Sequence, residues 1–167
     1  GKEFAAFEDQ ELVRIASSTA EIDVAESRRL QTAMGGDFGR AGLTRVEGRW
    51  VSQDGTAPSI LYRGAAQIDA FPFLDDRQAG SAYVTFAARG GSEPNVLVIG
   101  VGGGVDVMIA LAHDAEQVKA VEVNHGMVKM VTADFDDYLA GLFGPQGRGT
   151  DGRVSLHHRE GRSFIRG

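Results

Sequence analysis

The stretch NVLVIGVGGGVDVMIALAH, residues 95–113, constrains the fold of this chain more than any other segment. A short continuous apolar run, residues 96–99, is typical of a strand inside a parallel sheet with both faces buried. It leads directly into a glycine-rich turn, after which the apolar side chains have helical spacing. A strand, a glycine turn and a helix leave backbone N–H groups free at a helix N-terminus, where a ligand can approach the main chain. The pattern predicts a small-molecule site, and a merely tight turn is the plain alternative.

The same rhythm continues toward the C-terminus. Residues 117–124, QVKAVEVN, form a second predicted strand, and 153–160, RVSLHHRE, a third. Between them a long amphipathic helix is expected over residues 125–144, and GRSFIRG at 161–167 begins another helix. Right-handed crossovers in such a βαβαβ unit predict a parallel sheet with the spatial order 3-2-1. The predicted apolar face of the long helix consists of Met127, Val131, Phe135, Leu139 and Phe143.

The first part of the chain differs in composition: it is rich in β-branched residues and in residues typical of turns. Residues 11–27 predict one long or two short strands, and residues 32–42 a glycine-rich loop. The Asp54-Gly55 pair between two β-rich runs predicts a hairpin, and residues 77–90 predict a short helix. We therefore divide the α/β chain into a β-rich N-terminal segment, 1–75, and a second domain, 76–167, that contains the predicted small-molecule site.

Composition excludes several classes of function. The formal net charge of -6 and the scattered basic residues are unlike a nucleic-acid-binding surface. The absence of cysteine excludes disulfides and thiolate metal sites, and it fits a reducing, cytoplasmic compartment. No apolar run approaches the roughly 18 residues needed to cross a bilayer.

An acidic residue, Glu122, ends the second predicted strand, 22 residues after Gly100. A carboxylate at this place can accept both hydrogen bonds of a ribose diol, although it also suits the surface end of a strand. The dinucleotide pattern G-x-G-x-x-G requires glycine at position 105, where this chain has Val105. An NAD-linked oxidoreductase is therefore disfavoured.

The spacing of Gly100, Gly102 and Gly104 resembles that of class I S-adenosylmethionine-dependent transferases. The motifs VLVIG, VEVN and GRVSLHHREGRSFI are similar to those of the spermidine synthase (polyamine aminopropyltransferase) branch. The resemblance implies a Rossmann-like methyltransferase fold, here its first βαβαβ half, preceded by a small β segment. It implies transfer of an aminopropyl or methyl group from decarboxylated S-adenosylmethionine or S-adenosylmethionine to an amine such as a polyamine, with no metal.

The resemblance also assigns roles to residues of the predicted site. Gly100, Gly102 and Gly104 would line the amino-acid end of the donor, and Glu122 would hold the ribose hydroxyls. Val123 would pack on the adenine ring. Glu160 and Gly161 stand where the family has an Asp-Gly pair that recognises the adenine amino group. The plain alternative for Glu160 is a carboxylate that caps a helix N-terminus.

Two departures from the family pattern affect these expectations. Gly103 stands where the family has an aspartate that faces the donor's ammonium group. Asp106 either substitutes for that aspartate or only complements the helix dipole. The family's catalytic aspartate follows a fourth strand, so no residue of this chain is assigned a catalytic role. We expect the parent protein to continue past Gly167, in some relatives with membrane segments, or a second copy to cover the open sheet edge. A non-catalytic module that retains the fold is the alternative to an enzyme.

The remaining polar groups predict no metal site. His157 and His158 are adjacent on a predicted strand and point to opposite faces. His113 and His125 suit the ends of helices, and the Asp134–Asp137 run suits a solvated helix face.

Overall fold

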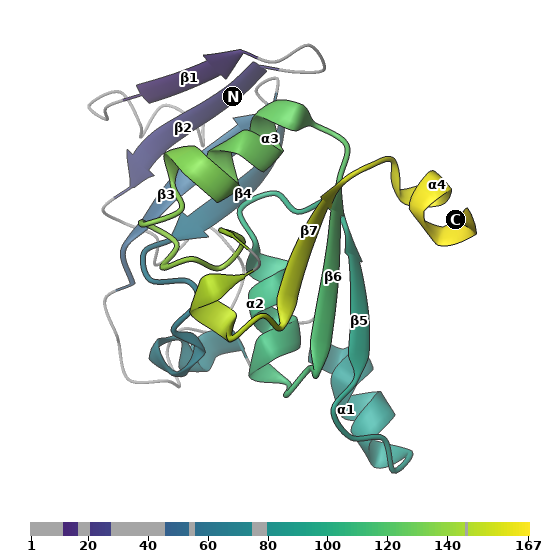
Figure 1. The fold of residues 1–167 in the computed structure, drawn as a ribbon. Coiled ribbons are helices and arrows are strands. Elements are labelled where there is room, and N and C mark those ends of the chain that lie inside the picture. The colour runs from purple at the N-terminus through teal and green to yellow at the C-terminus, as the bar shows by residue number, and fades with distance from the viewer. Residues whose placement is uncertain (1–11, 17–20, 28–45, 54–55, 75–79, 146) are drawn as a thin grey trace.

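The computed structural model describes residues 12–16, 21–27, 46–53, 56–74, 80–145 and 147–167. It has a mixed α/β architecture with one antiparallel and one parallel sheet (Figure 1). Both types of sheet are expected from the sequence. The predicted glycine-rich loop at 32–42 and the Asp54-Gly55 turn lie outside the described residues.

The antiparallel sheet contains the first four strands in sequential order. The predicted strand region 11–27 forms two strands, β1 and β2, and the predicted hairpin is the pair β3 and β4, with Trp50 opposite Ile60. Two 3₁₀ turns, Ile68–Ala70 and Pro72–Leu74, lead away from this sheet. The four strands are β1 (Leu12–Ala16), β2 (Glu21–Ser27), β3 (Gly48–Gln53) and β4 (Thr56–Tyr62).

The parallel sheet has the order β5-β6-β7, with β6 in the middle. Its strands alternate with helices, as the sequence pattern predicts. Figure 1 shows α2 and α3 on one side of this sheet, toward the antiparallel sheet, and α4 on the other. The elements are α1 (Ser81–Ala88), β5 (Asn95–Ile99), α2 (Val105–Ala112), β6 (Gln117–Glu122), α3 (His125–Lys129), a 3₁₀ turn (Arg148–Thr150), β7 (Val154–His158) and α4 (Gly161–Arg166).

A continuous hydrophobic core joins the two sheets. It includes Ile60 and Leu61 of β4, Met108 of α2, and Val118 and Ala120 of β6, all of which are fully buried. Burial of a large side chain such as Ile60, Leu61 or Met108 contributes about 1.5–3 kcal/mol to folding. Val118 and Ala120 of the central strand β6 thus belong to the core that joins the two layers.

The expectation that β5 is buried on both faces is wrong. Val98 is buried, but Leu97 is 42% exposed and Ile99 is 56% exposed. Successive side chains of a strand point to opposite faces, so Leu97 and Ile99 share the face that the core does not reach. Within the described residues, α4 is the helix that lies on that face, and its Gly161 approaches the Ile99 side chain. The expected apolar edge at β5 is present.

The expected long helix over 125–144 is also wrong in its length. α3 ends at Lys129, a π-helical turn covers Met130–Asp134, and turns follow. Ala140 and Gly141 have left-handed φ values of 55° and 75°, which no right-handed helix accommodates. The five apolar residues predicted to share one face are nevertheless all buried. Their spacing therefore predicts the core correctly, because turns with nearly helical spacing bring the same side chains inward.

Strand β4 of the antiparallel sheet packs directly against the glycine turn that follows β5. A Cβ atom on Gly103 would collide with the backbone carbonyl of Ile60. The Gly103 N–H donates a 2.7 Å hydrogen bond to Ser59 Oγ. The absence of a side chain at 103 is thus a packing requirement of the fold.

We predict that Gly103→Ala destabilises the protein by about 3 kcal/mol, because the backbone of β4 is not free to move away from an added methyl group. Gly103 lacks a left-handed φ, so the loss is purely steric. Gly90→Ala is the matched control: its φ of 84° is left-handed but nothing lies within 4 Å of the added Cβ, and about 1–2 kcal/mol is expected. Urea unfolding of both variants measures the difference, and equal losses would contradict the Gly103 contact.

Candidate functional site

The carboxyl ends of the three parallel strands meet at one edge of the sheet. Gly100, directly after β5, donates its N–H to the Val121 carbonyl at 2.9 Å. Arg159, directly after β7, donates its N–H to the Glu122 carbonyl at 3.0 Å. In parallel α/β sheets ligands bind outside this edge, so the residues that follow β5, β6 and β7 are the candidate site.

The Glu122 side chain links two of these segments. Its carboxylate accepts a 3.0 Å hydrogen bond from the Val101 N–H of the glycine turn and a 2.8 Å bond from the Asn124 N–H. Glu122 is only 6% exposed. Each carboxylate oxygen has two acceptor positions, so each retains one after these bonds. The structure therefore brings Glu122 and the glycine turn together, as the sequence predicts, and a structural function accompanies any binding function.

The glycine turn has three left-handed residues. The φ values of Gly100, Gly102 and Gly104 are 82°, 51° and 93°, a region that costs other residues about 1–2 kcal/mol each. The three residues thus need to be glycine for conformational reasons alone. The glycines stand at every second position because the left-handed φ values recur at every second position of the turn.

The glycines differ in what lies beside them. No atom lies within 4 Å of a Cβ added at Gly100, so open space adjoins this residue. A Cβ at Gly102 would lie 2.8 Å from Ser59 Oγ, and one at Gly104 would lie 2.9 Å from the Phe143 ring. At Gly100, therefore, a ligand has room to contact the backbone on the side where another residue would carry its side chain.

Ser59 belongs to this site, and the sequence analysis did not identify it. Ser59 lies on β4, and its Oγ accepts a hydrogen bond from the N–H of Gly103, 44 residues later in the chain. A serine within a predicted strand carries no local signal of such a contact. The contact shows that the antiparallel sheet supports the glycine turn directly.

The segment after β6 is shaped by Asn124, which caps α3. The Asn124 Oδ1 accepts hydrogen bonds from the Gly126 and Met127 N–H groups, at 2.9 and 3.4 Å. Between Glu122 and Asn124, Val123 is 54% exposed. The adenine contact assigned to Val123 stays a prediction.

Glu160 caps the N-terminus of α4. Its carboxylate accepts hydrogen bonds from the Arg162 N–H at 2.9 Å and from the Ser163 N–H at 2.8 Å, and from Ser163 Oγ. These bonds, the Arg162 bond first, lower the pKa of Glu160 below its ordinary value. This is the capping alternative that the sequence analysis left open. Glu160 and its neighbour Gly161 lie beyond the end of β7. Within the described residues, no hydrogen bond links Glu160 to Glu122.

Asp106 lies in the first turn of α2 and is exposed. It lines an open surface hollow of about 280 Å³ together with Tyr83, Ile109 and residues 96–99 of β5. Burial, and next the negative charge of Asp106, raise the pKa of Tyr83. No sequence signal pointed to Tyr83, whose ring also stacks on His113 at 4.9 Å.

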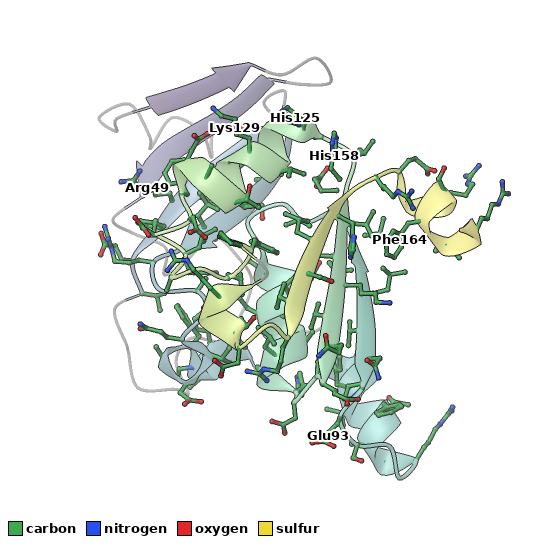
Figure 2. The ribbon with its side chains drawn as sticks, in the orientation of Figure 1. Arg49, Glu93, His125, Lys129, His158 and Phe164 are labelled. Carbon is green, nitrogen blue, oxygen red and sulfur yellow. The ribbon has the colours of Figure 1, made fainter. Side chains whose placement is uncertain are left out.

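The histidines make separate contacts, and Figure 2 shows His125 and His158 close together near the carboxyl end of the sheet. Their ring centroids are 5.2 Å apart, and His158 Nε2 lies 3.1 Å from the Val123 carbonyl. His157 instead contacts the Phe164 ring at 4.9 Å. Adjacent histidines of β7 thus contact different elements, and the His125–His158 pair was not predicted.

The acidic run 134–137 is neutralised by neighbouring bases. Arg148 forms ion pairs with Asp136 at 2.7 Å and Asp137 at 2.9 Å, and Lys129 lies 3.4 Å from Asp134. In the described part of the chain no three His, Asp or Glu side chains are grouped to hold a metal ion. Among the same residues, no helix has the length and apolar character to cross a membrane.

Comparison with known proteins does not assign the chain to a family. No protein-family model matches its sequence, and no curated protein matches it. The functional argument therefore depends on the residues themselves.

We predict that the NMR signals of the Arg162 and Ser163 backbone amides report the titration of Glu160. The midpoint should lie below 4.5, the ordinary pKa of glutamate. A carboxylate whose pKa is lowered by folding stabilises the folded state above its unfolded pKa, and this contribution disappears as the pH falls through the folded pKa. α4 therefore loosens in acid. NMR chemical shifts measure the midpoint, and Glu160→Gln should remove the titration. A midpoint at or above 4.5 would contradict the cap.

Proposed function

We propose that the chain is the nucleoside-binding part of a spermidine synthase-like transferase. Its donor is S-adenosylmethionine or the decarboxylated form, and an amine such as a polyamine accepts the aminopropyl or methyl group. The finer assignment of a Rossmann-like methyltransferase fold belongs to the same proposal. The parallel β5-β6-β7 sheet with α2 and α3 on one face supports it.

One observation carries the proposal: the buried Glu122 carboxylate adjoins a left-handed glycine turn that has open space at Gly100. A nucleoside needs an acceptor pair for its ribose diol and a backbone without side chains beside it. The unused acceptor position on each Glu122 oxygen supplies the first, and Gly100 supplies the second. Val123 adds an exposed apolar surface next to the carboxylate.

The proposed chemistry needs little from the protein beyond placement. A sulfonium donor is already activated, so the protein aligns an in-line displacement by a neutral amine and excludes water from it. The carbon–sulfur bond breaks as the nitrogen–carbon bond forms, and the thioether leaves. The residue that accepts the amine proton is not assigned within this chain.

Gly103 bears on which donor is used. The position that carries a carboxylate in the family is filled here by the β4 backbone at Ile60, so no side chain can reach the donor from residue 103. This favours S-adenosylmethionine over its decarboxylated form. It also favours the second candidate function, a non-catalytic module that keeps the nucleoside site, and product formation by the parent protein distinguishes the two.

We predict an energetic coupling between Glu122 and the ribose 2′-hydroxyl. The wild-type chain should bind methylthioadenosine about tenfold more tightly than its 2′-deoxy analogue, because a charged acceptor loses a hydrogen bond worth about 1.5–3 kcal/mol. In Glu122→Gln this preference should fall below about twofold, since the amide no longer offers two free acceptors. Calorimetric titration measures all four affinities.

Glu122→Gln also weakens the bonds to Val101 and Asn124. That structural loss affects both ligands equally, so the difference between the two ligands isolates the contact with the 2′-hydroxyl. Glu116→Gln, an exposed glutamate before β6, is the matched control and should keep the full preference. NAD should bind more weakly than either nucleoside. An equal preference in wild type and Glu122→Gln would overturn the ribose assignment.

A further inference from the structure

Two histidines from different elements lie next to each other at the carboxyl end of the parallel sheet. His125 is the first residue of α3, and His158 is the last residue of β7 (Figure 2). Their ring centroids are 5.2 Å apart, and the ring planes are tilted by 49°. Both residues are exposed, so the contact gains little from burial. The hydrophobic effect therefore does not account for the pair.

A backbone carbonyl fixes the tautomer of His158. The Nε2 of His158 lies 3.1 Å from the carbonyl oxygen of Val123. A carbonyl oxygen can only accept, so Nε2 carries the proton and Nδ1 retains a free lone pair. Histidines that ligate metal ions commonly donate their other ring N–H to a backbone carbonyl in this way. His158 is thus oriented to ligate through Nδ1.

His125 supplies a second ligand at a suitable distance. Within the described residues, no hydrogen bond engages a ring nitrogen of His125. Zn²⁺ binds imidazole nitrogen at about 2.0–2.1 Å, so two imidazoles on one tetrahedral ion have their ring centroids about 5 Å apart. The 5.2 Å between the centroids of His125 and His158 matches this spacing.

The charges beside the pair favour a cation. Glu122 is the partner of His158 in the parallel register, so the two side chains lie on the same face of the sheet. Lys129, one turn after the start of α3, is neutralised by an ion pair. Arg159 follows His158 and is exposed, so solvent and salt screen its charge. The Glu122 carboxylate is therefore the buried charge on this side of the pair.

We propose that His125 and His158 together bind a divalent transition-metal ion of the kind that imidazole suits, Zn²⁺ or Cu²⁺. The ion has two ligands from the protein, and water or a small molecule with nitrogen or oxygen donors completes its coordination. No group of three ligands is required, and none is present in the described part of the chain. The sequence gave no sign of this site because His125 and His158 are far apart in the chain. The site is independent of the proposed transferase.

The test is a calorimetric titration of the full chain, without a polyhistidine tag, with zinc chloride in a buffer that does not chelate metals. His125→Gln and His158→Gln should each weaken Zn²⁺ binding at least about tenfold, because a single imidazole is left. The double variant should lose little more than either single variant, since the ligands of one ion are coupled. Mg²⁺, which prefers oxygen ligands, should not compete with Zn²⁺.

His157→Gln is the matched control, because it makes the same change at the neighbouring residue of β7, whose ring contacts Phe164 instead. It should bind Zn²⁺ as the wild type does. An equal loss in His157→Gln and His158→Gln would overturn the inference, as would unchanged binding in His125→Gln. Absence of saturable Zn²⁺ binding below about 1 mM, the range of weak complexes, would overturn it too.

NMR of the histidine rings separates loss of a ligand from loss of the fold. His125 is exposed, so His125→Gln should keep the spectrum of the folded chain. With added Zn²⁺ the ring signals of His125 and His158 should shift together in the wild type, while those of His113 and His157 stay in place. A shift of only one of the pair would contradict a shared ion. Because these titrations contain no nucleoside, their outcome leaves the proposed function untouched.

Discussion

The Glu122 carboxylate is the interaction on which the rest of the site depends. By accepting the Val101 and Asn124 N–H groups it attaches the glycine turn after β5 to the start of α3 after β6. A buried carboxylate is stable only when it is hydrogen-bonded, and the two backbone bonds give each Glu122 oxygen one partner. The same bonds set the relative position of two loops that come from different strands, and so define the surface that a nucleoside would meet.

The second constraint is the contact between the antiparallel sheet and this glycine turn. Ser59 and Ile60 of β4 occupy the space beside Gly102 and Gly103, and the hydrophobic core continues from β4 through α2 to β6. The N-terminal strands therefore do more than precede the parallel sheet. They determine which side of the turn a ligand can approach, and they leave Gly100 as its open position.

Local sequence patterns determined the elements of this protein. The apolar run before Gly100 predicted β5, the spacing after Gly104 predicted α2, and the apolar residues from Met127 to Phe143 predicted buried positions correctly. Such patterns succeed because strand and helix periods place side chains on one face wherever the chain goes. The length of α3 was mispredicted because the helix gives way to a π-helical turn at Met130–Asp134 and then to turns, while the apolar spacing continues.

Only the tertiary structure decided which groups meet. Ser59 reaches Gly103 across 44 residues, and Tyr83 lies close enough to Asp106 for its pKa to respond to that charge. The uncovered face of β5 likewise depends on where the helices pack and not on its own apolar run. These contacts join residues far apart in the chain, and their energy depends on distance and burial, for which a single sequence holds no local signature.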